Sequence, residues 1–309
     1  MNNEVGPAEV EWLLTLAELP VLESMEPLEG GWDNSNFLLR LKDGSEVVLK
    51  AWFANSVEEV GGVVQRHIHL DSHGIPTTVP LRLSDGGHIA ERNGVAWTIL
   101  PFVPGGMLGC DGDSLRSLGE VMGKMGSIPP ADCFPDSYRM GFDLFEEVAS
   151  LSSRMGVSDP FVEMLDSQIA GIRRDFPSNL PMGILHGDLF PDNVIGSGGR
   201  VSAILDLEEA WTGPMAFDLA MACVGFGWNG TVPVMERWTA LLDGYQSVRK
   251  LTRDEMDSMP FLHRFATLCI ASWRFWKHNL REPDESLSHR YVEMVDRLSV
   301  EIDFSEVFG

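Results

Sequence analysis

Three residues in the second half of the chain have the types and spacing needed to move a phosphoryl group. Asp188 and Asn193 lie five positions apart in the pattern His-x-Asp-x-x-x-x-Asn, which begins at His186. In catalytic loops with this spacing the aspartate orients an attacking hydroxyl and accepts its proton, and the asparagine binds a metal ion. Asp206 follows thirteen residues after Asn193. Together these residues indicate phosphoryl transfer to a hydroxyl.

The stretch between Asn193 and Asp206 predicts a β-hairpin that brings the two side chains together. Its centre, 196–200, is the sequence Gly-Ser-Gly-Gly-Arg, and apolar residues flank it on both sides. Amide and carboxylate oxygens suit Mg²⁺, with water and phosphate in the remaining coordination positions. A surface loop with chance acidic residues is the competing interpretation, and the agreement between the spacing and the hairpin disfavours it.

The elements before this segment form a sheet-rich first third. Apolar residues at helical spacing over 9–24, interrupted by Pro20, predict a short opening helix. A polar, glycine-containing turn at 42–45 lies between two apolar runs and predicts a hairpin. The predicted strands are 36–41, 46–52, 81–83, 88–92 and 96–102, and a second helix is predicted over 57–73.

The stretch 101–109 contains two prolines and three glycines and marks a predicted domain boundary. Helical periodicity dominates after it, over 114–125, 143–154 and 161–174. A sheet-rich part followed by a helix-rich part predicts an α+β fold of two lobes with a cleft between them. We place residues 1–103 in the first lobe and residues 104–309 in the second.

The loop 186–193, followed by Leu205 and Asp206, resembles the aminoglycoside phosphotransferase and choline kinase superfamily. The resemblance extends from Gly30 to about Arg297 and is closest to the homoserine kinase branch. It implies a bilobal protein-kinase-like fold, with an N-terminal antiparallel sheet lobe that contains one main helix and a larger, mostly helical C-terminal lobe. The motifs that carry the closer match are Asn-Ser-Asn-Phe at 34–37, Val-Glu-Glu at 57–59, the loop 186–193 and Arg-Phe-Trp at 274–276.

The resemblance implies an ATP site in the first lobe. Lys50 ends an apolar strand and is similar to the strand lysine that contacts the α and β phosphates of ATP. A solvent-facing lysine at a strand end is the competing interpretation. Glu58 or Glu59 would be the acidic partner of this lysine, and a helix-dipole role in the first turn of the helix competes with that interpretation.

Two further segments complete the implied nucleotide site. The loop 30–37, which includes Ser35 and Asn36, would cover the phosphates with free backbone N–H groups. In the hinge 100–105, the carbonyl of Pro101 and the N–H of Val103 would face adenine, and proline tolerates this role because only its carbonyl is used. The implied cofactors are ATP and Mg²⁺.

The resemblance assigns the chemistry to the second lobe. Asp188 would be the catalytic residue, Asn193 and Asp206 the metal ligands, and Asp218 a structural brace for the catalytic loop. The expected reaction is the transfer of the γ-phosphoryl group of ATP to the hydroxyl of homoserine. An aminoglycoside or an amino alcohol such as choline is the alternative acceptor. A non-catalytic nucleotide-binding regulatory protein is the second alternative, which the intact set of chemical residues disfavours.

Two features bear on the acceptor. Arg274 begins a basic stripe at helical spacing, which either anchors a carboxylate or forms a solvated face paired with acidic neighbours. The stripe continues with Lys277, His278 and Arg281. Glu208 lies in the stretch 207–210, which replaces aromatic residues common in the superfamily. Its carboxylate would also suit a cationic acceptor, so that alternative stays open.

Composition excludes several classes of partner. The chain has 23 basic and 46 acidic residues among 309, and its net charge of −23 would repel a nucleic acid. Its four cysteines contain no C-x-x-C pair, which is typical of free thiols in a reducing cytosol. No apolar run reaches about 18 residues, and the acidic N-terminus has the wrong charge for a signal peptide. We therefore expect a cytoplasmic monomer or homodimer that binds a small-molecule hydroxyl substrate and no membrane.

Overall fold

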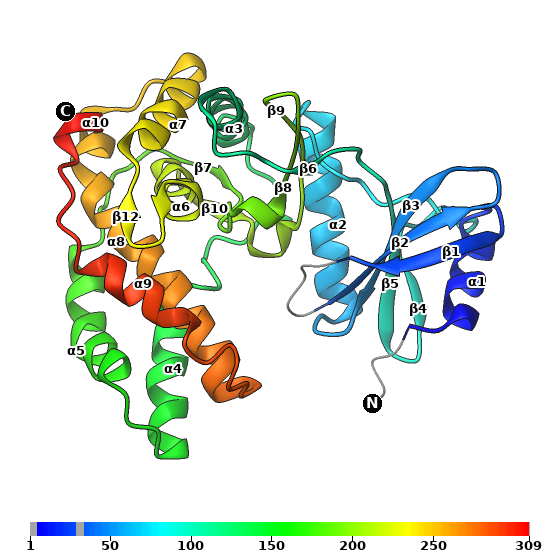
Figure 1. Ribbon diagram of the computed structural model, residues 1–309, viewed down its shortest axis with the longest axis horizontal. Helices are drawn as coiled ribbons and strands as arrows, with labels where there is room; N and C mark the ends of the chain where they lie inside the picture. Colours follow the sequence, from blue (N-terminus) through cyan, green and yellow to red (C-terminus); the bar gives the residue numbers. More distant parts are fainter. Residues whose placement is uncertain (1–4, 29–33, 309) are drawn as a thin grey trace. The chain divides into compact units, whose positions relative to one another are not determined.

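A computed structural model describes residues 5–28 and 34–308 of the chain, which divide into two compact units (Figure 1). The first unit is Met1–Gly106 together with Ser202–Glu208, and the second is Met107–Val201 together with Glu209–Gly309. Each unit is described by itself. Within the described ranges, no helix is long and apolar enough to cross a membrane.

The first unit is built on a five-stranded antiparallel sheet with strand order β1-β2-β3-β5-β4. The predicted hairpin of β2 and β3 and the predicted second helix are confirmed. β1 was not predicted, and the run 81–83 is not a strand, although the Leu81 N–H donates to the Ile99 carbonyl at 2.7 Å. The elements are α1 (Pro7–Leu16), β1 (Leu22–Pro27), β2 (Ser35–Leu41), β3 (Glu46–Trp52), α2 (Val57–Ser72), β4 (Ala90–Arg92) and β5 (Val95–Pro101).

The two faces of this sheet carry different kinds of side chain. Residues alternate between faces along a strand, so Leu49 and Lys50 of β3 point to opposite sides. Leu49 belongs to an apolar core with Leu39, Ile99 and the buried face of α1. The opposite face carries Lys50, whose directly paired neighbours are Asn36 on β2 and Thr98 on β5. In Figure 1, α1 and α2 lie on opposite sides of the sheet.

The segment Ser202–Glu208 belongs to the first unit although it follows the loop 186–193 in sequence. The Ile204 N–H donates to the Pro76 carbonyl at 2.8 Å, and the Thr77 hydroxyl donates to the Ile204 carbonyl at 2.8 Å. The buried His67 of α2 contacts the Thr77 hydroxyl through Nδ1 at 2.7 Å. These bonds hold the residues just before Asp206 in place.

The second unit is mostly helical. Its strands include an antiparallel pair, β7 with β10. β8 forms a hairpin with β9, which continues into the first-unit segment Ser202–Glu208, and the turn contains Gly198 and Gly199 at positive φ. Its helices are α3 (Gly112–Gly126), α4 (Phe142–Met155), α5 (Pro160–Asp175), α6 (Ala216–Phe226), α7 (Met235–Val248), α8 (Arg253–Phe275), α9 (Arg290–Leu298) and α10 (Ser305–Phe308). The remaining elements are β6 (Gly106–Met107), β7 (Met182–Leu185), η1 (Pro191–Asn193), β8 (Val194–Ser197), β9 (Arg200–Ile204), η2 (Leu207–Glu209), β10 (Trp211–Pro214), β11 (Trp228–Asn229), β12 (Val232–Pro233) and η3 (Trp276–Arg281).

The basic stripe that begins at Arg274 is not a solvated helix face. The helix α8 passes into η3, a π-helix with more residues per turn, and the regular 3.6-residue spacing is lost there. Lys277 and His278 are buried, and only Arg281 is exposed. Lys277 pairs with Glu282 at 2.9 Å, so one part of the predicted pairing with acidic neighbours is present.

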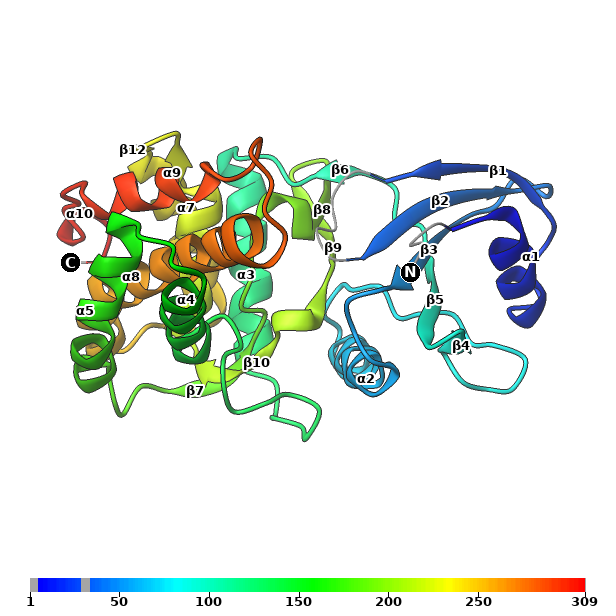
Figure 2. The ribbon, with the colours of Figure 1, turned by 90° about the horizontal axis from the view of Figure 1, so that it is seen from below.

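Glycines bring α3 and α7 into close contact (Figure 2). A Cβ built on Gly119 would overlap the Leu241 carbonyl oxygen, and one built on Gly244 would overlap the Arg116 carbonyl oxygen. The two helices therefore pack backbone against backbone, which no larger residue permits at these positions.

We predict that Gly244→Ala destabilises the protein by about 1–3 kcal/mol, because the new methyl group overpacks the α3–α7 contact. Urea unfolding followed by circular dichroism measures the change. Gly171→Ala in α5 is the matched control, since nothing lies within 4 Å of its Cβ position, and it should stabilise by about 0.5–1 kcal/mol. Equal stability of both variants would contradict the close-packing interpretation.

Candidate active site

The loop that follows β7 is held at its start by one buried carboxylate. Asp218, in the first turn of α6, is 1% exposed, and it accepts the backbone N–H groups of His186 at 2.6 Å and Gly187 at 2.9 Å. Burial raises the pKa of Asp218 to about 7, and the two N–H bonds oppose that shift. The structure thus places Asp218 where a brace for the loop is expected.

Gly187 is required by its surroundings. Its φ is +83°, and a Cβ there would lie 2.6 Å from the Glu209 carbonyl oxygen. The Tyr138 hydroxyl donates to the Gly187 carbonyl at 2.6 Å, and the Tyr138 ring stacks on Trp211. The backbone at this position is therefore fixed from several sides.

The structure brings Asp188 and Asn193 together. The Asn193 amide donates to the Asp188 carboxylate at 2.9 Å and to the Asp188 carbonyl at 2.8 Å. The Asp188 N–H donates to Nδ1 of the buried His186 at 3.1 Å, so His186 packs and orients the loop. The Asn193 side chain uses its nitrogen for Asp188, which leaves its carbonyl oxygen as a ligand atom.

Lys50 meets two carboxylates within the first unit. Its Nζ lies 3.0 Å from Glu208 and 3.4 Å from Asp206, and 3.9 Å from the centre of the Trp52 ring. Burial lowers the pKa of Lys50, but the charges of Asp206 and Glu208 outweigh it and the net shift is upward. Burial, together with the charge of Asp206, raises the pKa of Glu208. Lys50 therefore remains a cation on the sheet face opposite α1.

Two residues that the sequence reasoning missed support this cluster. The amide of the buried Asn34 donates to Glu208 and to Asn55, each at 3.0 Å. Arg66 of α2 donates to the carbonyls of Leu207 at 2.8 Å and Glu208 at 3.0 Å. Asn34 lies in the motif 34–37, whose resemblance to the homoserine kinase branch was the available signal, whereas nothing in the sequence singles out Arg66.

Asp206 has the properties of a metal ligand. Its φ is +53°, a left-handed conformation that costs a non-glycine residue about 1–2 kcal/mol and is concentrated at functional sites. Its Oδ1 is buried and has no hydrogen-bond partner among the described residues. A buried carboxylate oxygen left in this state is suited to a cation.

The predicted pairing of Lys50 with Glu58 or Glu59 differs from the structure. Both glutamates are exposed, and Glu59 forms a capping box with Ser56, its carboxylate accepting the Ser56 N–H at 2.7 Å. Glu208 occupies the position next to Lys50 instead. For Glu59 the structure agrees with the competing interpretation, a role in the first turn of the helix, because N-capping and the helix dipole both favour an acid there.

The other predicted nucleotide contacts lie at strand ends. Ser35 and Asn36 begin β2, and Asn36 is paired with Lys50 across the β2–β3 ladder. Pro101 ends β5, and the half-buried Val103 follows it. Residues 30–33 of the predicted phosphate loop lie outside the described residues.

The two predicted acceptor residues are both engaged in ion pairs. Glu208 is bound to Lys50 and Asn34, so the structure uses it within the lysine cluster rather than as an open carboxylate for a cationic substrate. Arg274 is largely buried, with a side chain that is 11% exposed, and it pairs with Glu293 at 2.9 Å.

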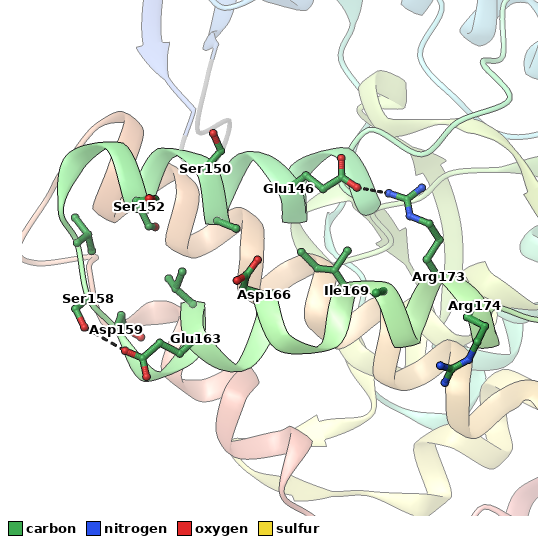
Figure 3. Close-up of a pocket in the computed structure, with 15 residues that line it drawn as sticks. Glu146, Ser150, Ser152, Ser158, Asp159, Glu163, Asp166, Ile169, Arg173 and Arg174 are labelled. Carbon is green, nitrogen blue, oxygen red and sulfur yellow. Dashed lines mark hydrogen bonds and ion pairs between the residues drawn. The ribbon is translucent and has the colours of Figure 1, made fainter.

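A groove of about 1030 Å³ runs between α4 and α5 (Figure 3). Carboxylates line it, but Glu146 is paired with Arg173 and Asp159 accepts a hydrogen bond from Tyr291. Glu163, near one end, accepts a hydrogen bond from the Ser158 hydroxyl at 3.2 Å, and Asp166 lies toward the middle of the groove. No residue of the loop 186–193 lines the groove.

Comparison with known proteins agrees with the fold. A profile of the APH phosphotransferase enzyme family matches residues 24–251. The homoserine kinase of Brucella anthropi is 30% identical over 278 residues, which are 86% of this chain and 83% of that protein. The homoserine kinase of Sinorhizobium fredii is 27% identical over 272 residues, with the same shares covered. An amicoumacin kinase solved with AMP-PNP and Ca²⁺ superimposes with a TM-score of 0.74 at 16% identity, covering 96% of each chain.

The family match defines a phosphotransferase. The likeness to protein-kinase-like structures confirms the predicted α+β fold class. The chain belongs to the APH phosphotransferase enzyme family. The resemblance to the homoserine kinase branch is also confirmed.

We predict that Asp218→Asn lowers kcat, because an amide oxygen accepts from only one of the two loop N–H groups and its NH₂ opposes the other. The variant should also change the pH dependence of stability. The native state keeps a proton on Asp218 between its ordinary pKa of 3.8 and about 7, so the contribution of Asp218 to the free energy of unfolding decreases as pH rises through that window. In Asp218→Asn this decrease should be absent, as measured by urea unfolding from pH 4 to 8. An unchanged slope would contradict the assignment.

Proposed function

We propose that this phosphotransferase transfers the γ-phosphoryl group of ATP to the side-chain hydroxyl of homoserine. The observation that carries the reaction type is the Asp188 carboxylate, which the Asn193 amide orients at 2.9 Å inside the loop His-x-Asp-x-x-x-x-Asn. The observation that supports the acceptor is the similarity to homoserine kinases over 86% of the chain.

In this reaction the acceptor oxygen forms a bond to the γ-phosphorus as the bond to the bridging oxygen of ADP breaks. Asp188 orients the hydroxyl and accepts its proton, and the phosphoryl group passes through a loose transition state. Lys50, with Ser35 and Asn36 nearby on the sheet, binds the phosphates of the nucleotide. The Lys50 ammonium has three N–H donors, so it can donate to phosphates while Glu208 contacts the same Nζ.

Mg²⁺ is the proposed cation, held by Asn193 and Asp206. Each residue has an oxygen to offer: the carbonyl oxygen of Asn193 and the buried Oδ1 of Asp206, which is unpartnered among the described residues. When bound, the ion neutralises the charge that develops on the transferred group. The AMP-PNP and Ca²⁺ of the amicoumacin kinase structure support a nucleoside triphosphate with a divalent cation.

The functions of the two lobes follow from the resemblance. Residues 1–103 bind the nucleotide, with Pro101 and Val103 facing adenine, and residues 104–309 carry the catalytic loop and the acceptor site. The cytoplasmic location and the state as a monomer or homodimer remain predictions.

Cationic acceptors such as aminoglycosides are the alternative. The groove between α4 and α5 offers Glu163 and Asp166 to a cation, but no residue of the loop 186–193 lines it. Homoserine is therefore the better-supported acceptor.

We predict that Asp188→Ala lowers kcat by about 10²–10⁴-fold with little change in the Kd of ATP, because the variant loses proton acceptance but not phosphate binding. Coupled ADP release measures kcat, and nucleotide titration measures Kd. Asp257→Ala on the exposed side of α8 is the control and should retain full turnover. Unchanged turnover in Asp188→Ala would remove this residue from the mechanism.

The acceptor is tested by coupled ADP release with Mg-ATP and a panel of hydroxyl compounds. The panel contains homoserine, choline, ethanolamine, 5-methylthioribose, hydroxylysine and several aminoglycosides. We expect turnover on homoserine to exceed that on the others. Turnover confined to an aminoglycoside would replace the proposed acceptor, and ATP binding without turnover on any compound would favour a regulatory protein.

A further inference from the structure

The backbone around Asp206 is held on its N-terminal side by α2 and by the segment that follows this helix. The Ile204 N–H donates to the Pro76 carbonyl, and the Thr77 hydroxyl donates to the Ile204 carbonyl, each at 2.8 Å. This donation uses the only hydrogen of the Thr77 hydroxyl, so in its 2.7 Å contact with His67 the imidazole Nδ1 is the donor. The residue two positions before Asp206 is therefore tied to α2.

On the C-terminal side of Asp206, one arginine of α2 holds two successive carbonyls. Nη1 of Arg66 donates to the Leu207 carbonyl at 2.8 Å and to the Glu208 carbonyl at 3.0 Å. Arg66 is half-buried, and Leu207 is fully buried. Hydrogen bonds from a charged donor are stronger than those between neutral groups, and shielding from water strengthens them further. These two bonds therefore fix the peptide groups that follow Asp206.

The conformation of Asp206 requires such support. Its φ of +53° lies in the left-handed region, which a residue other than glycine keeps only where its surroundings impose it. Its Oδ2 lies 3.4 Å from Lys50 Nζ, which is longer than a usual hydrogen bond, and its Oδ1 has no partner among the described residues. The neighbouring peptide groups must therefore supply much of the constraint on this backbone.

We propose that Arg66 is a positioning residue for the cation site. By holding the carbonyls of Leu207 and Glu208, it keeps Asp206 in the left-handed conformation that leaves Oδ1 available to a metal ion. This inference rests on the proposed function, in which Asp206 is a ligand of Mg²⁺. Groups that orient a metal ligand without touching the ion change metal affinity by about 10–100-fold when they are removed. In this role Arg66 acts through the backbone alone.

The contacts of Arg66 are separate from those that hold Lys50. Lys50 Nζ contacts the Glu208 carboxylate at 3.0 Å, and the Asn34 amide donates to the same carboxylate at 3.0 Å. Both contacts use the side chain of Glu208, whereas Arg66 binds its backbone carbonyl. Loss of the Arg66 guanidinium should therefore weaken metal binding while metal-free nucleotide binding, which depends on Lys50, is retained.

The experiment measures metal binding directly, with Mn²⁺ as the probe because it takes the same oxygen ligands as Mg²⁺. Mn²⁺ is titrated into the full chain and followed by electron paramagnetic resonance, with AMP-PNP kept below the protein concentration so that all of it is bound. For Arg66→Met we expect the Kd of Mn²⁺ to rise about 10–100-fold. The Kd of AMP-PNP measured in EDTA should stay unchanged.

Two other variants serve as references for this titration. Arg66→Lys should recover part of the affinity, because its ammonium keeps N–H donors on a shorter side chain. It also carries the test if Arg66→Met does not fold, with a smaller rise in the Kd of Mn²⁺ expected. Gln65→Met is the matched control, since Gln65 is the exposed neighbour of Arg66 on α2, and it should bind Mn²⁺ as the wild type does.

A double variant tests whether Arg66 acts through Asp206. Asp206→Ala should weaken Mn²⁺ binding, and adding Arg66→Met should weaken it no further, because both changes act on one ligand. A further loss in the double variant would overturn the inference. So would an unchanged Kd of Mn²⁺ in Arg66→Met, or an equal weakening of metal-free AMP-PNP binding, which would show a general structural role. If Asp206→Ala binds Mn²⁺ as tightly as the wild type, the proposed metal ligand itself fails, and this result separates the two failures.

Discussion

The carboxylate of Asp218 is the contact on which the loop 186–193 depends. It is buried at the start of α6, and it accepts the first two N–H groups of the loop, which would otherwise be unsatisfied in the interior. A buried charge is costly, and the two N–H bonds offset only part of this cost, because the pKa of Asp218 is still raised to about 7. Because the loop begins at a fixed point, His186 and Asn193 can then orient Asp188 through short-range bonds within eight residues.

The charge of Lys50 in the first unit is likewise balanced and held by several partners. Lys50 has Asp206 and Glu208 as counter-ions, Asn34 donates to Glu208, and Arg66 holds the backbone at 207 and 208. The lysine is therefore kept charged and oriented in the absence of nucleotide.

Local patterns predicted much of the fold, and contacts distant in sequence account for what was missed. Apolar periodicity located α3, α4 and α5 to within two residues, and the turn at 42–45 located the β2–β3 hairpin. The strand β1 escaped because its alternation is weak next to Pro20, and it is defined by pairing with β2. Ser202–Glu208 joins the first unit through hydrogen bonds from Arg66 and Thr77, with His67 in contact with Thr77. The bonds of Arg66 and Thr77 link residues that are more than a hundred positions apart in sequence.

In the site, too, local motifs could be predicted from the sequence and contacts between distant residues could not. Asp188 and Asn193 were predicted from motif spacing, which is a local property, and the structure places the two in contact. The partner of Lys50 was misjudged because Glu58 and Glu59 are close in sequence, whereas Glu208 reaches the lysine through tertiary structure. The role of Arg274 depends on α9, and the π-helix turned Lys277 and His278 inward where a regular helix would have exposed them.

Gly187 constrains how this loop can change during evolution. Protein kinases have an arginine at the corresponding place, but in this chain the left-handed φ and the nearby Glu209 carbonyl leave no room for any side chain. A single exchange of glycine for arginine would therefore break the loop before any benefit of the new charge could be selected. The two kinds of loop are separated by linked changes, in which the backbone at 209 must move first, and intermediates between them are expected to be rare among functional sequences.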